Sequence, residues 1–153
     1  MSANVIRTSV IAGAVIGAVL IGGFPSLFFL ANNPDLAAIN LTIKLLLLGS
    51  ISGLLMGLAN GFLMNAIVFN RAQPRLSSNL FLCILANALV DSIISLIPLY
   101  YSAYIMIADA NNGVVNGMAL VLAMLLFSLP PTAITIFLMA VVVPLIIFIR
   151  NKD

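Results

Sequence analysis

Four long apolar stretches, separated by three short polar breaks, make up the chain. The breaks are rich in turn-forming residues and lie at residues 32–35, 71–79 and 109–113. Each stretch is continuous and holds the roughly 20 residues that a helix needs to cross a hydrocarbon core of about 30 Å. A transmembrane β-barrel would instead show segments of about 10 residues with alternating polarity. The pattern predicts an all-α integral membrane protein, a four-transmembrane-helix bundle that forms a single membrane domain over residues 1–153.

The composition supports this prediction. Of the 153 residues, 63% are hydrophobic and only 7% are charged, whereas an ordinary soluble domain carries about 25% charged side chains. Six basic and four acidic residues give a formal charge of +2, which is too little for a surface that binds nucleic acid. We therefore expect the lipid bilayer as the environment and no nucleic-acid partner.

Polar and aromatic residues within the apolar stretches set the expected limits of the spans. Lys44 is the one basic side chain inside a stretch, and its long stem can reach the interface. Tyr100, Tyr101 and Tyr104 have the composition of an interfacial aromatic belt. With these four residues as anchors on the outer side, the spans cover about 8–30, 45–69, 80–101 and 131–149. Residues 36–43 then lie along the outer surface or project from it.

The fourth stretch, residues 114–149, is about twice as long as one span requires. Pro130 and Pro131 interrupt it, because a continuous helix loses hydrogen bonds at proline. We therefore expect a broken or extended fourth helical segment. Residues 114–129 are a projecting helix, a re-entrant or interfacial segment, or a fifth short span. A fifth span would place Arg150 and Lys152 outside, against the charge rule.

Charged residues alternate between the breaks and predict the orientation. The two outer breaks contain Asp35 and Asp109, whereas the basic residues lie at the other junctions, namely Arg7, Arg71, Arg75, Arg150 and Lys152. The positive-inside rule then places both termini in the cytoplasm, N-in and C-in, in a multi-pass protein of the cell (cytoplasmic or inner) membrane. The first stretch is too long for a signal peptide and lacks a convincing cleavage site, so we expect an uncleaved span.

Glycines form a regular stripe in the second span. They recur at every fourth position, a glycine-zipper pattern made by Gly49, Gly53, Gly57 and Gly61. Small residues let membrane helices approach closely, and Gly13 and Gly17 in the first span offer a partner stripe. The stripes either pack the first two spans within one subunit or join copies of the chain into an oligomer. Lining of a pore is a third, less favoured interpretation.

Asp91 lies near the middle of the third span, where a carboxylate is most costly. Asn87 precedes it by one helical turn and Ser95 follows it by one turn. A hairpin of the second and third spans brings Asn60 to the same level. These four residues predict one polar layer, in which Asp91 has one of two roles. It is a neutral acid that bonds Asn60 and joins the helices, or it holds a proton or cation that it binds and releases.

Missing motifs narrow the function. The chain has no histidine and one cysteine, Cys83, so we expect no metal site and no cofactor. No phosphate-binding loop or nucleophile elbow occurs, and we expect no enzyme. The leading hypothesis is a homo-oligomer, or a subunit of a complex with another integral membrane protein, that transports or conducts an ion or small solute. The alternative is a non-transporting accessory, assembly or immunity-type protein that acts through helix–helix contacts.

Overall fold

A computed structural model describes residues 2–32, 36–69, 76–110 and 116–150. Within these ranges every residue except Asn116 is helical, so the described chain is all-α, as predicted. Four charged residues on which the sequence-based orientation depends, Asp35, Arg71, Arg75 and Lys152, lie outside the described residues.

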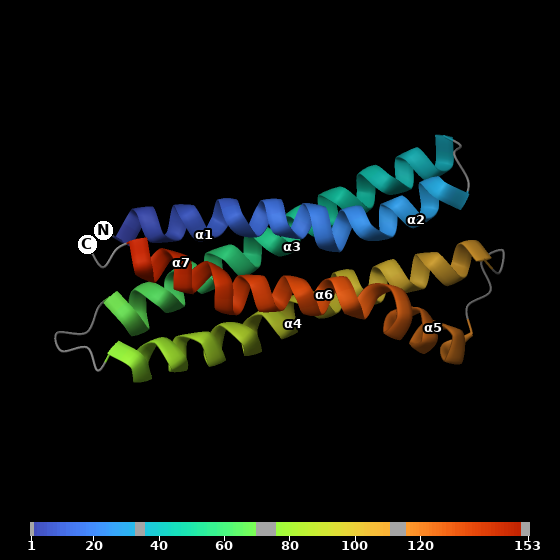
Figure 1. The fold of residues 1–153 in the computed structure, drawn as a ribbon. Helices are drawn as coiled ribbons and strands as arrows, with labels where there is room; N and C mark the ends of the chain where they lie inside the picture. Colours follow the sequence, from blue (N-terminus) through green and yellow to red (C-terminus); the bar gives the residue numbers. More distant parts are fainter. Residues whose placement is uncertain (1, 33–35, 70–75, 111–115, 151–153) are drawn as a thin grey trace.

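Four long helical segments run side by side along the bundle, and both termini lie at the same end (Figure 1). The first segment consists of α1 (Ser2–Ile16), the π-helical stretch η1 (Gly17–Gly23) and α2 (Phe24–Asn32). The second consists of α3 (Leu36–Met64) and η2 (Asn65–Phe69), and the third is α4 (Leu76–Ala110). The fourth runs through α5 (Gly117–Ala123), η3 (Met124–Ser128), α6 (Leu129–Phe137), η4 (Leu138–Val142) and α7 (Val143–Arg150).

All four segments are long and apolar enough to cross a membrane. The candidate spans are Asn4–Leu27, Ile39–Phe69, Ser78–Ile105 and Gly117–Arg150. At 1.5 Å per residue, the second and fourth of these are about 47 and about 51 Å long, well above the roughly 30 Å of a hydrocarbon core. Lys44 and Tyr100 lie inside continuous helices, so the helices extend beyond the spans predicted from the sequence. Interfacial side chains mark a depth in the membrane without ending the backbone hydrogen-bond ladder.

The fourth segment is a single helical run that changes direction at its prolines (Figure 1). Pro130 and Pro131 occupy the first turn of α6, where a missing N–H costs no intrahelical hydrogen bond. The preceding turn is π-helical, with the Leu129 N–H bonded to the Met124 carbonyl. Residues 117–129 therefore continue the fourth helical segment and pair with α4, where Ala123 packs against Ala103. The prolines bend the helix and do not break it.

The glycine stripes of α1 and α3 face each other within the chain. A Cβ atom added at Gly17 would lie 2.7 Å from the Gly53 Cα, and one added at Gly61 would lie 2.8 Å from the Ile6 Cα. Added Cβ atoms at Gly13, Gly49 and Gly57 would likewise meet backbone atoms of the opposite helix. The two helices thus touch through their backbones. Contacts between copies of the chain have to use other surfaces.

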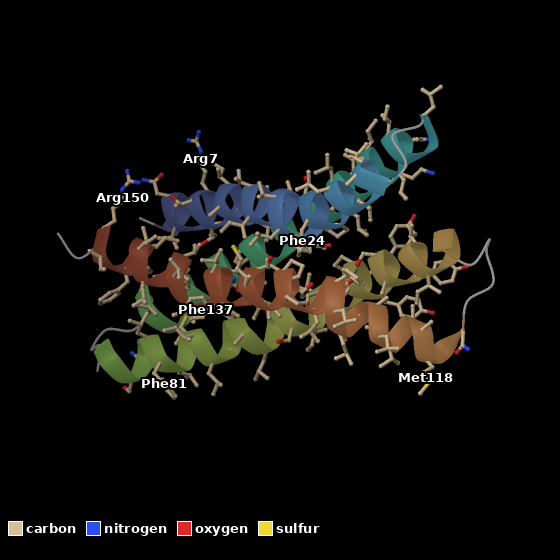
Figure 2. The ribbon with its side chains drawn as sticks, turned by 45° about the vertical axis from the view of Figure 1, so that its right-hand side comes forward. Arg7, Phe24, Phe81, Met118, Phe137 and Arg150 are labelled. Atoms are coloured by element: carbon tan, nitrogen blue, oxygen red, sulfur yellow. The ribbon has the colours of Figure 1, made fainter. Side chains whose placement is uncertain are left out.

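The outer surface of the bundle is apolar and suits contact with lipid. Large side chains such as Phe81, Ile97 and Leu27 are 68–72% exposed, and Figure 2 shows Phe81 and Phe137 pointing away from the bundle. The interior contains buried polar residues among methionine and valine side chains. This distribution, with apolar residues outside and polar ones inside, is the reverse of that in a soluble protein.

Candidate polar site between the helices

Asp91 is fully buried halfway along the third candidate span. Of the charged side chains that the structure describes, Arg7, Lys44 and Arg150 are exposed near the ends of their segments, and only Asp91 is interior. An ionisable group at such a depth is expensive to hold and is a functional candidate by default. Asp91 is therefore the centre of the candidate site.

Asn60 connects Asp91 to two other helical segments. Its Nδ2 atom donates a hydrogen bond to the Asp91 Oδ2 atom at 2.9 Å and another to the Met139 carbonyl at 3.1 Å. Asn60 lies on α3, Asp91 on α4 and Met139 on η4. One buried amide thus links three of the four segments, in the middle of the bundle.

The Met139 carbonyl is free to accept because of the local helix geometry. In the π-helical turn η4 the Val143 N–H donates to the Leu138 carbonyl, five residues back. The next π-type bond would join the N–H of residue 144 to the Met139 carbonyl, but residue 144 is proline and has no N–H. Asn60 supplies the missing donor from another helix. The proline in the fourth segment and the asparagine in the second therefore act as a pair.

Asn87 and Ser95 are buried on the same face of α4 as Asp91, one turn on either side of it. Their donors, however, are used along their own helix. Asn87 Nδ2 donates to the Cys83 Sγ at 3.7 Å, and the Ser95 hydroxyl donates to the Ser92 carbonyl at 2.8 Å. The structure thus brings Asn60 and Asp91 into contact and places Asn87 and Ser95 beside them without a hydrogen bond to the carboxyl.

Three oxygen atoms of this site are buried without a hydrogen-bond partner. They are Oδ1 of Asn60, Oδ1 of Asn87 and Oδ1 of Asp91, and within the described ranges only the Thr42 hydroxyl shares this condition. Buried polar atoms are nearly always paired, and an unpaired one costs about 1–3 kcal/mol. All three are acceptors unless the carboxyl is protonated. The site therefore has an excess of oxygen acceptors over donors, which a proton or a small cation would relieve.

Two polar contacts of the fourth segment were not predicted. The Ser102 hydroxyl of α4 donates to the Ser128 hydroxyl at 3.0 Å, and the Thr135 hydroxyl donates to the Pro131 carbonyl at 2.8 Å. The Thr135 bond differs from the Asn60 bond, because it runs back four residues along its own helix, as serine and threonine hydroxyls in helices commonly do. A serine or threonine inside an apolar span was the signal that could have found it.

The expected interfacial anchors lie on the outside of the bundle. Lys44, Tyr100, Tyr101 and Tyr104 are exposed, and the Tyr100 and Tyr104 rings stack with centroids 6.4 Å apart.

Within the described ranges no group of three His, Cys, Asp or Glu residues could hold a metal ion.

No protein-family model, curated protein or solved structure matches this chain. Its function has to be inferred from the geometry of the polar site and the surfaces around it.

Proposed function

We propose that this protein crosses the membrane four times and transports or conducts an ion or small solute, with a proton or small monovalent cation bound at the Asn60–Asp91 site. The supporting observation is that the buried Asp91 carboxyl has one oxygen without a partner, and that Asn60, which bonds it, and Asn87, one turn before it, each have an unpartnered oxygen as well. A bound proton turns one carboxyl oxygen into a donor and removes the charge. A bound cation satisfies the oxygens directly, as carbonyl groups do in ion-coupled transporters.

Occupancy of this site is coupled to the packing of the bundle through Asn60. A proton on Asp91 weakens the carboxyl oxygen that accepts from Asn60, and a cation competes with the Asn60 amide for it. The same amide also holds the Met139 carbonyl of the fourth segment. That segment contains two π-helical turns and the prolines at positions 130, 131 and 144. Such irregular turns near the midplane resemble the broken helices around transporter sites. Binding or release of a proton or cation at Asp91 can thus change how the fourth segment packs, through the bonds of Asn60.

Flux measurements on reconstituted protein test this proposal. Liposomes containing the wild-type protein are expected to pass H⁺, Na⁺ or K⁺ faster than empty liposomes, and Asp91→Asn should abolish that flux and its pH dependence. The matched control is Ser92→Ala, because the neighbouring Ser92 is exposed and bonds only to the Ala88 carbonyl of its own helix. Circular dichroism verifies that both variants are folded. Unchanged flux in folded Asp91→Asn, or no flux through the wild-type protein, refutes the proposal.

A second candidate is a non-transporting accessory, assembly or immunity-type protein. It is favoured by the length of the bundle, because helices of about 50 Å extend beyond a hydrocarbon core of about 30 Å. At the end opposite the termini the two hairpins diverge (Figures 1 and 2), and Leu36 and Met118 there are 85% and 76% exposed. Apolar surface outside the lipid suits another integral membrane protein or a second copy of the chain.

Purification in mild detergent distinguishes the two candidates. The accessory role predicts a co-purifying protein that is lost from the double variant Leu36→Ser and Met118→Ser and retained by Asp91→Asn. The transport role predicts that flux is lost from Asp91→Asn and retained by the double variant Leu36→Ser and Met118→Ser. The oligomeric state of the wild-type protein, measured in the same detergent by light scattering, shows whether copies of the chain take the partner's place.

We also propose that both termini face the cytoplasm of the cell membrane. Single cysteines at positions 4 and 118, in a chain whose Cys83 is replaced by alanine, test the orientation with a membrane-impermeant maleimide. Met118→Cys should react in intact cells, and Asn4→Cys only after the cells are permeabilised. The reverse pattern overturns the orientation, and labelling of both from outside overturns the count of three spans between them.

A further inference from the structure

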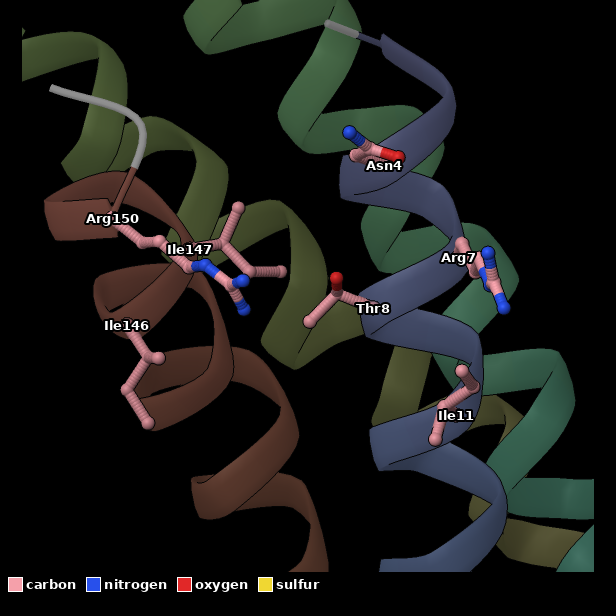
Figure 3. A pocket seen from close by; sticks show the side chains of 7 residues that line it. All are labelled: Asn4, Arg7, Thr8, Ile11, Ile146, Ile147 and Arg150. Atoms are coloured by element: carbon pink, nitrogen blue, oxygen red, sulfur yellow. The ribbon is translucent and has the colours of Figure 1, made fainter. Parts of the chain in front are cut away.

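A groove of about 410 Å³ opens between α1 and α7, at the end of the bundle that carries both termini (Figure 3). Its volume lies in the range of small-molecule sites, roughly 300–1,000 Å³. Seven residues line it, four from α1 and three from α7: Asn4, Arg7, Thr8, Ile11, Ile146, Ile147 and Arg150. The groove shares no residue with the polar site.

The lining changes from polar to apolar along the helices. On α1 the lining positions 4, 7, 8 and 11 fall on one helical face. Asn4, Arg7 and Thr8 come first, and Ile11 follows one turn deeper in the helix. On α7 the order is the same when read from the terminus, with Arg150 outermost and Ile147 and Ile146 deeper. The lining of the groove therefore matches a phospholipid, with charged residues at the level of a headgroup and apolar residues at the level of an acyl chain.

The charged part of the groove is purely cationic. Arg7 and Arg150 are both exposed, and no acidic residue is among the lining residues. In Figure 2 both arginines stand off the same side of the bundle, and in Figure 3 Arg150 reaches from α7 towards Thr8 while Arg7 projects from the far side of α1. Guanidinium groups bind phosphate oxygens in pairs, and basic pockets between membrane helices bind lipid headgroups.

We propose that this groove binds the headgroup phosphate of an anionic phospholipid. Arg150 is the principal contact because it already extends into the gap, and Arg7, which projects from the far side of α1, adds a second positive charge beside the phosphate. An acyl chain then lies along Ile11 and Ile146. Such a lipid joins the first helix to the last. It is independent of the Asn60–Asp91 site, so the two proposals can fail separately.

Lipid titrations of the purified full-length chain test the proposal. Native mass spectrometry in mild detergent compares phosphatidylglycerol with phosphatidylcholine of the same acyl chains. One basic residue near a membrane surface contributes about fivefold to the binding of an anionic lipid. We expect phosphatidylglycerol to bind at least about fivefold more tightly. Arg150→Gln should lose about that factor, and the double variant with Arg7→Gln should lose the preference altogether.

Two controls keep the result specific. Lys44→Gln removes a cation outside the groove, since the adjacent Leu45 packs against Gly22, well beyond the lining residues of α1, and it should leave the preference intact. Arg150→Lys, which keeps the charge but not the paired donors, should lose less than Arg150→Gln. Inorganic phosphate at millimolar concentration should not displace phosphatidylglycerol. Equal binding of both lipids, an equal loss in Lys44→Gln, or displacement by inorganic phosphate overturns the proposal.

Discussion

Replacing Gly53 by alanine tests whether backbone contact between α1 and α3 holds the bundle together. The added Cβ atom would meet the Gly13 carbonyl group, with its carbon 2.8 Å away, and the Gly17 Cα atom at 2.9 Å. Carbon atoms prefer separations of about 3.5–4.0 Å. Because both neighbours are backbone atoms, no side-chain rotation can make room. The two helices have to move apart by about 1 Å at this point.

The sign of the stability change is the informative result. Overpacking of a tight interior costs about 1–3 kcal/mol, whereas alanine in place of glycine favours a helix by about 1 kcal/mol. The sum predicts that Gly53→Ala lowers the free energy of unfolding by up to about 2 kcal/mol. A glycine that faced lipid would show only the propensity effect. In that case the substitution would stabilise the protein.

The assay is reversible unfolding in mixed micelles, with sodium dodecyl sulfate as the denaturant and far-UV circular dichroism as the signal. Gly117→Ala is the matched control, because no heavy atom lies within 4 Å of a Cβ added there. It should be neutral or stabilising, by no more than about 1 kcal/mol. If Gly53→Ala stabilises the protein as much as Gly117→Ala does, the glycine contact is not what holds these helices together.

Two further predictions concern the polar contacts and use the same unfolding assay. Asn60→Ala should lower the free energy of unfolding by about 1–2 kcal/mol, because it removes two hydrogen bonds and each bond between membrane helices contributes about 0.6 kcal/mol, at most about 1.7. This loss should be smaller in the Pro144→Ala background, where a backbone N–H can reach the Met139 carbonyl. Additive effects of the two substitutions would contradict the pairing of the proline with the asparagine. Ser102→Ala should cost about 0.6 kcal/mol through loss of the bond to Ser128, and a neutral result would show that this bond contributes nothing.

The number of helical segments could be predicted from the sequence because the signal is continuous apolar length. In the described chain this gives four segments that are apolar enough to cross a membrane. The limits of the segments were less predictable. Lys44 and the tyrosine belt that begins at Tyr100 were used to limit spans, yet α3 and α4 continue past them. Their backbones stay hydrogen-bonded whether lipid or water surrounds the helix. Hydropathy reports depth in the membrane, and helix ends depend on the backbone.

The contents of the polar site were predictable only in part. Asp91 and Asn60 could be matched from the depth of each residue in its span, and the structure joins them at 2.9 Å. The third member, the Met139 carbonyl, carries no side-chain signal. It depends on the π-helical turn η4, whose register is a product of packing against α4 and the rest of the bundle. Side-chain chemistry can be read from a sequence, whereas a backbone group becomes available only after the helix register is known.

The two kinds of interface in the bundle indicate where the movement that the proposed transport requires would take place. Glycine contacts leave α1 and α3 no space to slide, since nearly every added atom meets backbone. The Asn60 junction instead rests on two hydrogen bonds from one amide and on a segment that contains prolines and π-helical turns. Bonds of this strength exchange at a small energetic cost, so the fourth segment can shift against a rigid α1–α3 pair. Substitutions at Asn60 should therefore have their main effect on flux, and substitutions at Gly53 should have theirs on the free energy of unfolding. If flux and stability fell together at both positions, the bundle would be moving as a single body.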